Sequence, residues 1–114
     1  MRSHPQELRI YETSQGETPF SSWLSSLRDR EARARIRKRL DRIELGNLGD
    51  YRSVGGGVFE FKIDYGPGYR VYFAQIDLLI ILLLCGGDKS TQERDILQAK
   101  QFWLDYKQRE HANE

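Results

Sequence analysis

Four polar side chains of the kind that bind and cleave a phosphodiester lie close together in the sequence: Glu60, Lys62, Arg70 and Tyr72. Arginine binds phosphate oxygens in a bidentate manner, and lysine supplies a compact positive charge. A ribonuclease that works without a metal needs a base to deprotonate the ribose 2′-OH. It also needs cations to hold the negative charge that develops on the phosphate, and an acid to protonate the leaving oxygen. These residue types can supply all three.

The roles follow from the side-chain chemistry. Glu60 is the candidate base, Arg70 and Lys62 are the candidate charge stabilisers, and Lys89 or Tyr72 can assist. The competing interpretation is a solvated sheet face on which Glu60 pairs with a neighbouring cation, an interaction worth about 0.2–1 kcal/mol. The residue types alone leave both interpretations open.

The elements that position these residues are predicted from period-two alternation. Residues 58–64 and 69–75 alternate around the turn Tyr65-Gly66-Pro67-Gly68, which predicts an antiparallel hairpin. Phenylalanines such as Phe59 and Phe61 are expected to face the helices, which turns Glu60, Lys62, Arg70 and Tyr72 away from them. Lys89 follows a buried strand over 78–85 and is expected to reach the same face.

The remaining pattern completes an α+β domain. Residues 8–12 read as a strand, and Thr18-Pro19 begins a helix with an apolar face. A second helix is expected from about Asp29 to Leu45, and Ser90 with Glu93 predicts a capping box on a last helix. Residues 55–57 are interpreted as a flexible, glycine-rich segment leading into the hairpin. We therefore expect one domain, 1–114, with two N-terminal helices and a C-terminal helix on a mostly antiparallel four-stranded sheet.

Charge is concentrated in one segment. Residues 28–42 hold eight basic and three acidic side chains, whereas the whole chain carries a net charge of only +1. Such asymmetry indicates a polyanionic or acidic partner, although a solvated helix face is an equally good interpretation. The candidate RNA- or ribosome-binding residues are Arg33, Arg35, Arg37, Lys38 and Arg39 in this segment and Tyr72 on the hairpin.

Composition excludes several other classes. A single cysteine, Cys85, rules out an intramolecular disulfide framework, and no apolar run approaches the roughly 20 residues of a membrane-spanning helix. The histidines, His4 and His111, lie near the termini, so no zinc-binding spacing exists and we expect no metal or other cofactor. No secretory signal is evident. We therefore expect a cytoplasmic protein that does not interact with membranes.

The segments "VFEFKIDYGPGYRVYF", "LLLCGGDKSTQERDI" and "AKQFWLDY" resemble the HigB-type (phage Gp49-like) addiction-module killer proteins of the RelE/ParE superfamily. The resemblance covers nearly the whole chain. It implies the toxin of a type II toxin–antitoxin system, which cleaves mRNA, often on the translating ribosome. A co-encoded antitoxin with a helix-turn-helix domain would neutralise it.

The resemblance also implies site residues. Arg70 matches the arginine after the Gly-Tyr of the hairpin, Lys62 matches a basic residue of the preceding strand, and Lys89 matches one after the last strand. Two positions depart from the pattern. Glu60 stands where a basic residue is common, and Asp95 stands where nucleases of this type have a tyrosine.

Two other functions remain open. One is a binding toxin like the ParE branch, which poisons DNA gyrase and lacks a nuclease site. The other is a catalytically degenerate module kept for antitoxin binding. The shared face of Arg70, Lys62 and Lys89 favours the endoribonuclease.

Overall fold

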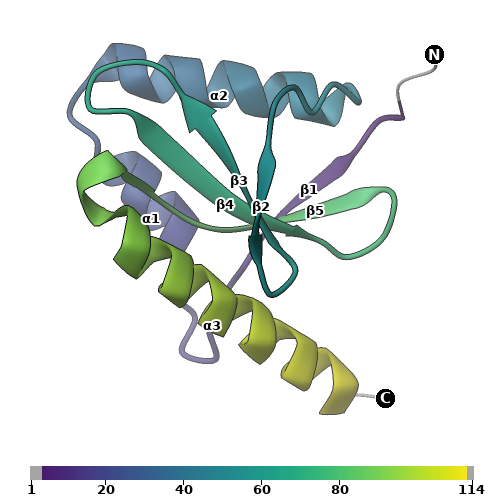
Figure 1. Ribbon diagram of the computed structural model, residues 1–114. Helices are drawn as coiled ribbons and strands as arrows, with labels where there is room; N and C mark the ends of the chain where they lie inside the picture. The colour runs from purple at the N-terminus through teal and green to yellow at the C-terminus, as the bar shows by residue number, and fades with distance from the viewer. Residues whose placement is uncertain (1–3, 113–114) are drawn as a thin grey trace.

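The computed structural model describes residues 4–112, so residues 1–3 and 113–114 of the predicted domain lie outside the described part. One sheet of five strands carries three helices (Figure 1). In chain order the elements are β1 (Glu7–Ile10), α1 (Pro19–Ser26), α2 (Arg30–Glu44), β2 (Arg52–Gly55), β3 (Val58–Ile63), β4 (Tyr69–Gln75), β5 (Ile80–Asp88), the short 3-10 helix η1 (Lys89–Thr91) and α3 (Gln92–Ala112).

The strands lie in the order β1-β5-β4-β3-β2. β1 runs parallel to β5, with Glu7 opposite Ile80, and the other neighbouring strands are antiparallel. The predicted four-stranded, mostly antiparallel sheet is therefore wrong, because the sheet is mixed and has a fifth strand, β2. Residues 55–57, interpreted as a flexible segment, instead form the tight β2–β3 turn, where all three glycines have positive φ.

Helices cover both faces of the sheet. On one face, α1 and α2 pack their apolar stripes against Phe61, Val71 and Phe73. On the other, α3 packs Ala99 against a second cluster that includes Tyr72 and Leu84. Figure 1 shows α2 at the top of the view and α3 crossing the lower part of the molecule. The sheet face of Glu60 and Tyr72, which was predicted to point away from the helices, is therefore largely covered by α3.

The side chains just before α1, α2 and η1 show how each helix begins. Asp29 caps α2, since its carboxylate accepts hydrogen bonds from the backbone N–H groups of Glu31 and Ala32. Thr18 precedes α1 but makes no side-chain capping hydrogen bond. The predicted Ser90–Glu93 capping box does not form, because Asp88 accepts hydrogen bonds from the Ser90 N–H and hydroxyl and thereby starts η1.

Two consecutive glycines on β5 allow close packing on both sides of the sheet. A Cβ on Gly86 would overlap the ring of Trp23 from α1, and a Cβ on Gly87 would overlap the carboxylate of Asp95 from α3. The Gly-Gly pair thus fixes how near α1 and the start of α3 come to the sheet. Among residues 4–112, no helix is both long and apolar enough to cross a membrane.

Candidate functional site

Three neighbouring strands place one cation each around a single cavity. Arg52 comes from β2, Lys62 from β3 and Arg70 from β4, and Lys62 lies directly opposite Arg70 in the antiparallel register. The cavity holds about 340 Å³. Its other lining residues are Asp50, Tyr51, Glu60 and Gln92. The sheet register thus brings three positive charges and two carboxylates to one place.

Glu60 contacts Arg52, Gln92 and Arg70, which also line the cavity. Its Oε1 lies 2.8 Å from Arg52 Nε, and its Oε2 accepts a hydrogen bond of 2.9 Å from the Gln92 side-chain amide. Arg70 Nε lies 4.0 Å from the same Oε2. Burial alone would raise the pKa of Glu60, but the hydrogen bonds from Arg52 and Gln92 outweigh it and the pKa is lowered. Glu60 is therefore ionised, and both of its carboxylate oxygens already have hydrogen-bond donors.

Arg70 is nearly buried, contrary to its predicted position on an open sheet face. Its side chain is 9% exposed, and Arg70 Nη1 donates a hydrogen bond of 2.7 Å to the Gly68 carbonyl. Its Nε has no hydrogen-bond partner among the described residues. The Arg70 guanidinium therefore has an unsatisfied N–H donor. Burying a hydrogen-bond donor without a partner costs about 1–3 kcal/mol of stability.

Lys62 and Lys89 flank Arg70 on the outer side. Lys62 is half exposed and lies 3.4 Å from the Asp64 carboxylate. Lys89 is the first residue of η1 and is exposed. A second depression of about 370 Å³ beside the Gly66–Gly68 turn is lined by Lys62, Arg70 and Lys89 together. The three cations predicted to share a face therefore do meet around one surface.

Two sequence-predicted polar residues lie elsewhere. Tyr72 is fully buried beneath α3, so it does not offer an RNA-binding surface. Its hydroxyl has no hydrogen-bond partner of normal geometry within residues 4–112, and burial and the nearby Glu60 raise the pKa of Tyr72 and keep it protonated. Asp95 is also buried, and it accepts a hydrogen bond of 2.5 Å from the Thr91 hydroxyl. Asp95 thus lies at the α3–sheet junction and does not line the cavity.

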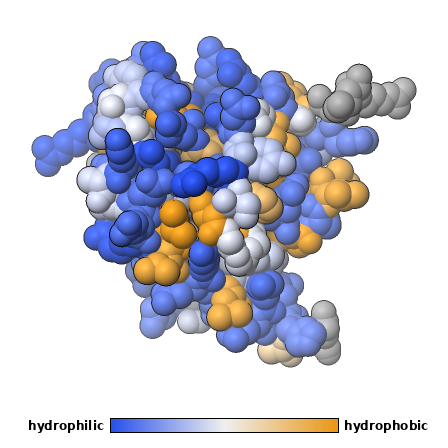
Figure 2. Space-filling model, in the orientation of Figure 1, coloured by the Kyte–Doolittle hydropathy of each residue, from blue (hydrophilic) through white to orange (hydrophobic). Residues whose placement is uncertain are grey.

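The structure divides the predicted basic residues of α2 into two groups. Arg35, Lys38 and Arg39 line a groove of about 550 Å³ between α2 and β3. Arg33 and Arg37 do not line it, and the Arg33 guanidinium donates a hydrogen bond to the Leu27 carbonyl instead. The surface over α2 is mainly hydrophilic (Figure 2).

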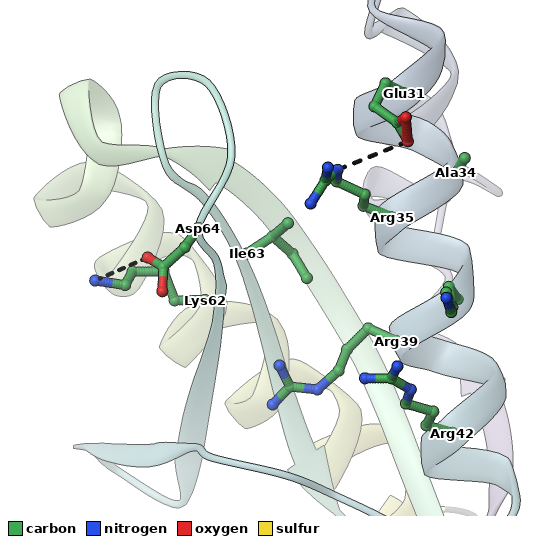
Figure 3. Close-up of a pocket in the computed structure, with 9 residues that line it drawn as sticks. Glu31, Ala34, Arg35, Arg39, Arg42, Lys62, Ile63 and Asp64 are labelled. Carbon is green, nitrogen blue, oxygen red and sulfur yellow. Dashed lines mark ion pairs between the residues drawn. The ribbon is translucent and has the colours of Figure 1, made fainter.

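The groove also includes a residue outside the predicted set. Arg42 lines it together with Lys62, Ile63 and the acidic residues Glu31 and Asp64. In Figure 3, Arg35, Arg39 and Arg42 extend from α2 toward β3, whereas Lys62 and Asp64 lie on the other side of that strand. Lys62 is a lining residue of both the groove and the cavity.

Sequence reasoning missed Arg52, Gln92, Asp50 and Tyr51. Arg52 was missed because β2 was not recognised. The signal was a Gly-Gly turn between two short extended runs, a common hairpin pattern that would have paired Arg52 with Glu60. Gln92 carried no local signal, since its position depends on how α3 packs across the sheet.

This arrangement suits the binding of a phosphate and the transfer of a proton. Three cations surround the cavity, and Asp50 offers a second carboxylate that is exposed. Tyr51 is 47% exposed at the cavity and packs edge-on against Phe59 and Phe73, so its ring is a fixed aromatic surface. Among residues 4–112, no three His, Cys, Asp or Glu side chains cluster in a way that could hold a metal ion.

No protein-family model matches the chain. An uncharacterized protein of Haemophilus influenzae is 53% identical to it over 81 residues, which cover 71% of this chain and 82% of the relative. Identity at this level over most of both chains implies a shared fold. The chain belongs to the same protein family as this Haemophilus influenzae protein.

Proposed function

We propose that the protein is the toxin of a type II toxin–antitoxin system and that it is an mRNA endonuclease. The observation that carries this proposal is the convergence of Arg52, Lys62 and Arg70 on one cavity that also holds two carboxylates. The incompletely paired guanidinium of Arg70 supports it further. The hairpin and Gly-Gly-Asp-Lys motifs that resemble HigB-type toxins border this same surface.

The mechanism is cleavage by the substrate's own ribose. A carboxylate accepts the proton of the 2′-OH as that oxygen attacks the adjacent phosphorus in line. Arg52, Lys62 and Arg70 stabilise the negative charge that develops on the phosphate oxygens. Lys89, which lines the outer depression together with Arg70, protonates the departing 5′-oxygen. The products are a 2′,3′-cyclic phosphate and a 5′-hydroxyl end.

The two carboxylates have different roles in this proposal. Glu60 accepts hydrogen bonds from Arg52 and Gln92, and its lowered pKa makes it a poor proton acceptor. Asp50 is exposed and lines the same cavity, so it is the better candidate base. Glu60 is then a positioning residue that orients Arg52 and Arg70. This assignment replaces the interpretation of Glu60 as the base.

The partners follow from the same proposal. The substrate is mRNA on the translating ribosome, and a co-encoded helix-turn-helix antitoxin neutralises the toxin. The site of action is then the cytoplasm. Support for these partners comes from the resemblance and from the concentration of positive charge on α2.

Expression in a bacterium that lacks the antitoxin tests the proposal. We expect growth arrest and new mRNA 5′ ends at in-frame positions. Both should disappear in Arg70→Ala and stay reduced in Arg70→Lys, because lysine keeps the charge but loses the bidentate geometry. Lys107→Ala, which removes an exposed cation from α3 outside the cavity, is the control. Since Arg70 is nearly buried, folding of each variant is checked by circular dichroism.

Two other results would replace this proposal. Growth arrest with intact mRNA and accumulating DNA breaks would favour a gyrase poison like the ParE branch. No growth effect at matched expression would favour a degenerate antitoxin-binding module. Growth arrest by a folded Arg70→Ala variant would show that the cavity is not the site.

A further inference from the structure

The groove between α2 and β3 is larger than the candidate cleavage cavity. It holds about 550 Å³, compared with about 340 Å³ for the cavity around Arg70. Ile63 and Lys62 of β3 lie on the strand side of the groove, beyond residues 58–60, which pair with β2. Five cations line the groove against two acidic residues. The cations are Arg35, Lys38, Arg39, Arg42 and Lys62.

Two of these arginines are fixed in place before any ligand binds. Arg39 lies 4.7 Å from the Phe61 ring centroid and donates hydrogen bonds to the carbonyls of Leu48 and Asp50. Its buried Nε has no hydrogen-bond partner among the described residues, as is also true of Arg70 Nε. Arg35 lies 4.6 Å from the Tyr65 ring centroid. Fixed guanidinium groups lose little entropy when they bind an anion.

The spacing of the cations follows one side of the helix. Arg35, Arg39 and Arg42 follow one another at steps of four and three residues, and Lys38 lies three residues after Arg35 and four before Arg42, so they form a row along α2 beside the apolar stripe that enters the core. A row of this kind matches a chain of phosphates better than it matches a single anion.

The groove favours a nucleic acid over an acidic peptide. Peptide docking usually combines charge with pockets for apolar side chains. Here the aromatic rings next to these arginines, Phe61 and Tyr65, do not line the groove and lie against Arg39 and Arg35. The remaining lining is mainly charged. A phosphate backbone needs nothing further, because its affinity comes from the cations.

The groove adjoins the candidate cleavage site. Lys62 lines both the groove and the cavity, and Asp50, whose carbonyl accepts a hydrogen bond from Arg39, lines the cavity as well. Tyr51 offers an exposed ring at the cavity on which a base can stack.

We propose that this groove binds the phosphate backbone of the RNA strand whose scissile phosphate lies in the cavity at Arg70. The inference rests on the proposed function, since it names a second part of the same RNA site. Arg35, Lys38, Arg39 and Arg42 hold several phosphates on one side of the cleavage point. The cavity then receives the strand in a fixed register.

The test is a binding measurement that does not depend on cleavage. A fluorescent single-stranded RNA with 2′-O-methyl riboses lacks the nucleophile and cannot be cut by the proposed mechanism. Its affinity is measured by anisotropy between about 50 and 200 mM salt, using oligonucleotides of about four and about twelve nucleotides. The variants are Lys38→Gln and Arg42→Gln in the groove. Lys107→Gln makes the same kind of charge change on α3, outside the groove.

We expect the longer RNA to bind more tightly, and each groove substitution to lower the slope of log K against log salt by roughly 0.7. Lys107→Gln should leave that slope nearly unchanged. An equal effect of Lys107→Gln, no gain from the longer RNA, or no binding at all would overturn the proposal. Displacement of the RNA by polyglutamate at equal charge would overturn it in favour of an acidic peptide.

Failure of the groove and failure of the nuclease remain distinguishable. If the groove variants weaken RNA binding while mRNA stays intact in cells, the groove stands and the nuclease assignment fails. If mRNA is cut by a mechanism that needs Arg70 but the groove variants bind RNA normally, the nuclease stands and the groove assignment fails.

Discussion

Arg52 and Glu60 lie directly opposite each other on β2 and β3, and Arg52 Nε is 2.8 Å from Glu60 Oε1. The Arg52 side chain is 61% exposed, whereas that of Glu60 is 5% exposed. The pair therefore links a buried carboxylate to a cation that remains accessible at the cavity. Arg52 supplies this cation to the cavity from the strand next to Glu60.

The first prediction concerns the role of Glu60 in stability. The pKa of this carboxyl is lowered in the folded protein. Its ionised form therefore stabilises the fold above the unfolded pKa, and that contribution is lost as the pH falls through the folded pKa. Glu60→Gln should destabilise the protein at neutral pH by about 1–3 kcal/mol. Urea denaturation at neutral and acidic pH measures the effect.

The pH dependence of the unfolding free energy is the control for this prediction. Because the amide introduced by Glu60→Gln cannot titrate, the gap in unfolding free energy between the wild type and this variant should narrow as the pH falls below about 4. A gap of constant size from neutral to acidic pH would contradict the stabilising role of the ionised carboxylate.

The second prediction separates the two carboxylates of the cavity. Asp50→Asn should slow cleavage by about 100- to 10,000-fold, the scale for loss of a general base, whereas Glu60→Gln should slow it less, because Glu60 only positions Arg52 and Arg70. Single-turnover cleavage of mRNA on programmed ribosomes measures both rates. A larger loss for Glu60→Gln than for Asp50→Asn would return the base to Glu60.

The third prediction concerns Arg52, which the sequence pattern did not reveal. Because Arg52→Ala leaves the buried Glu60 carboxylate without its charged partner, it should cost about 1–3 kcal/mol of stability. It should also slow cleavage by about 100-fold, the scale for loss of one group that stabilises transition-state charge. Arg94→Ala, an exposed arginine at the start of α3 that does not line the cavity, is the matched control. Equal cleavage rates for Arg52→Ala and the control would remove Arg52 from the site.

The fourth prediction tests the close packing at β5. Gly86→Ala should destabilise the protein by about 1–3 kcal/mol, because the added methyl group overlaps the Trp23 ring. The backbone of Gly86 does not have positive φ, so the cost is one of packing alone. Gly16→Ala is the contrasting case, since Gly16 has open space but φ of 84°. Thermal unfolding compares them, and an unchanged melting temperature for Gly86→Ala would contradict the packing.

Local pattern was sufficient for the central hairpin. Alternation on either side of Tyr65-Gly66-Pro67-Gly68 predicted β3 and β4, and the register places Lys62 opposite Arg70 as the period-two pattern requires. The stripe of Ala32, Ile36, Leu40 and Ile43 likewise predicted α2. Both elements are long enough for their periodicity to be unambiguous.

Features that depend on tertiary packing were not predictable in this way. Tyr72 and Asp95 look like exposed polar residues in the sequence, but α3 crosses the sheet and buries both. β2 has only four residues and follows a loop, so its pattern was too short to identify it as a strand. Because β2 was not predicted, neither the fifth strand of the sheet nor the position of Arg52 at the cavity could be predicted.

The central claim is that RNA is cut in the cavity that Arg52, Lys62 and Arg70 surround. The most direct measurement is the chemistry of the RNA ends left after purified protein acts on programmed ribosomes. Cleavage by the substrate's 2′-OH predicts a 2′,3′-cyclic phosphate and a 5′-hydroxyl, formed by the wild type and by Lys107→Ala but not by folded Arg70→Ala. Intact RNA with the wild type, or the same ends with Arg70→Ala, would contradict the account.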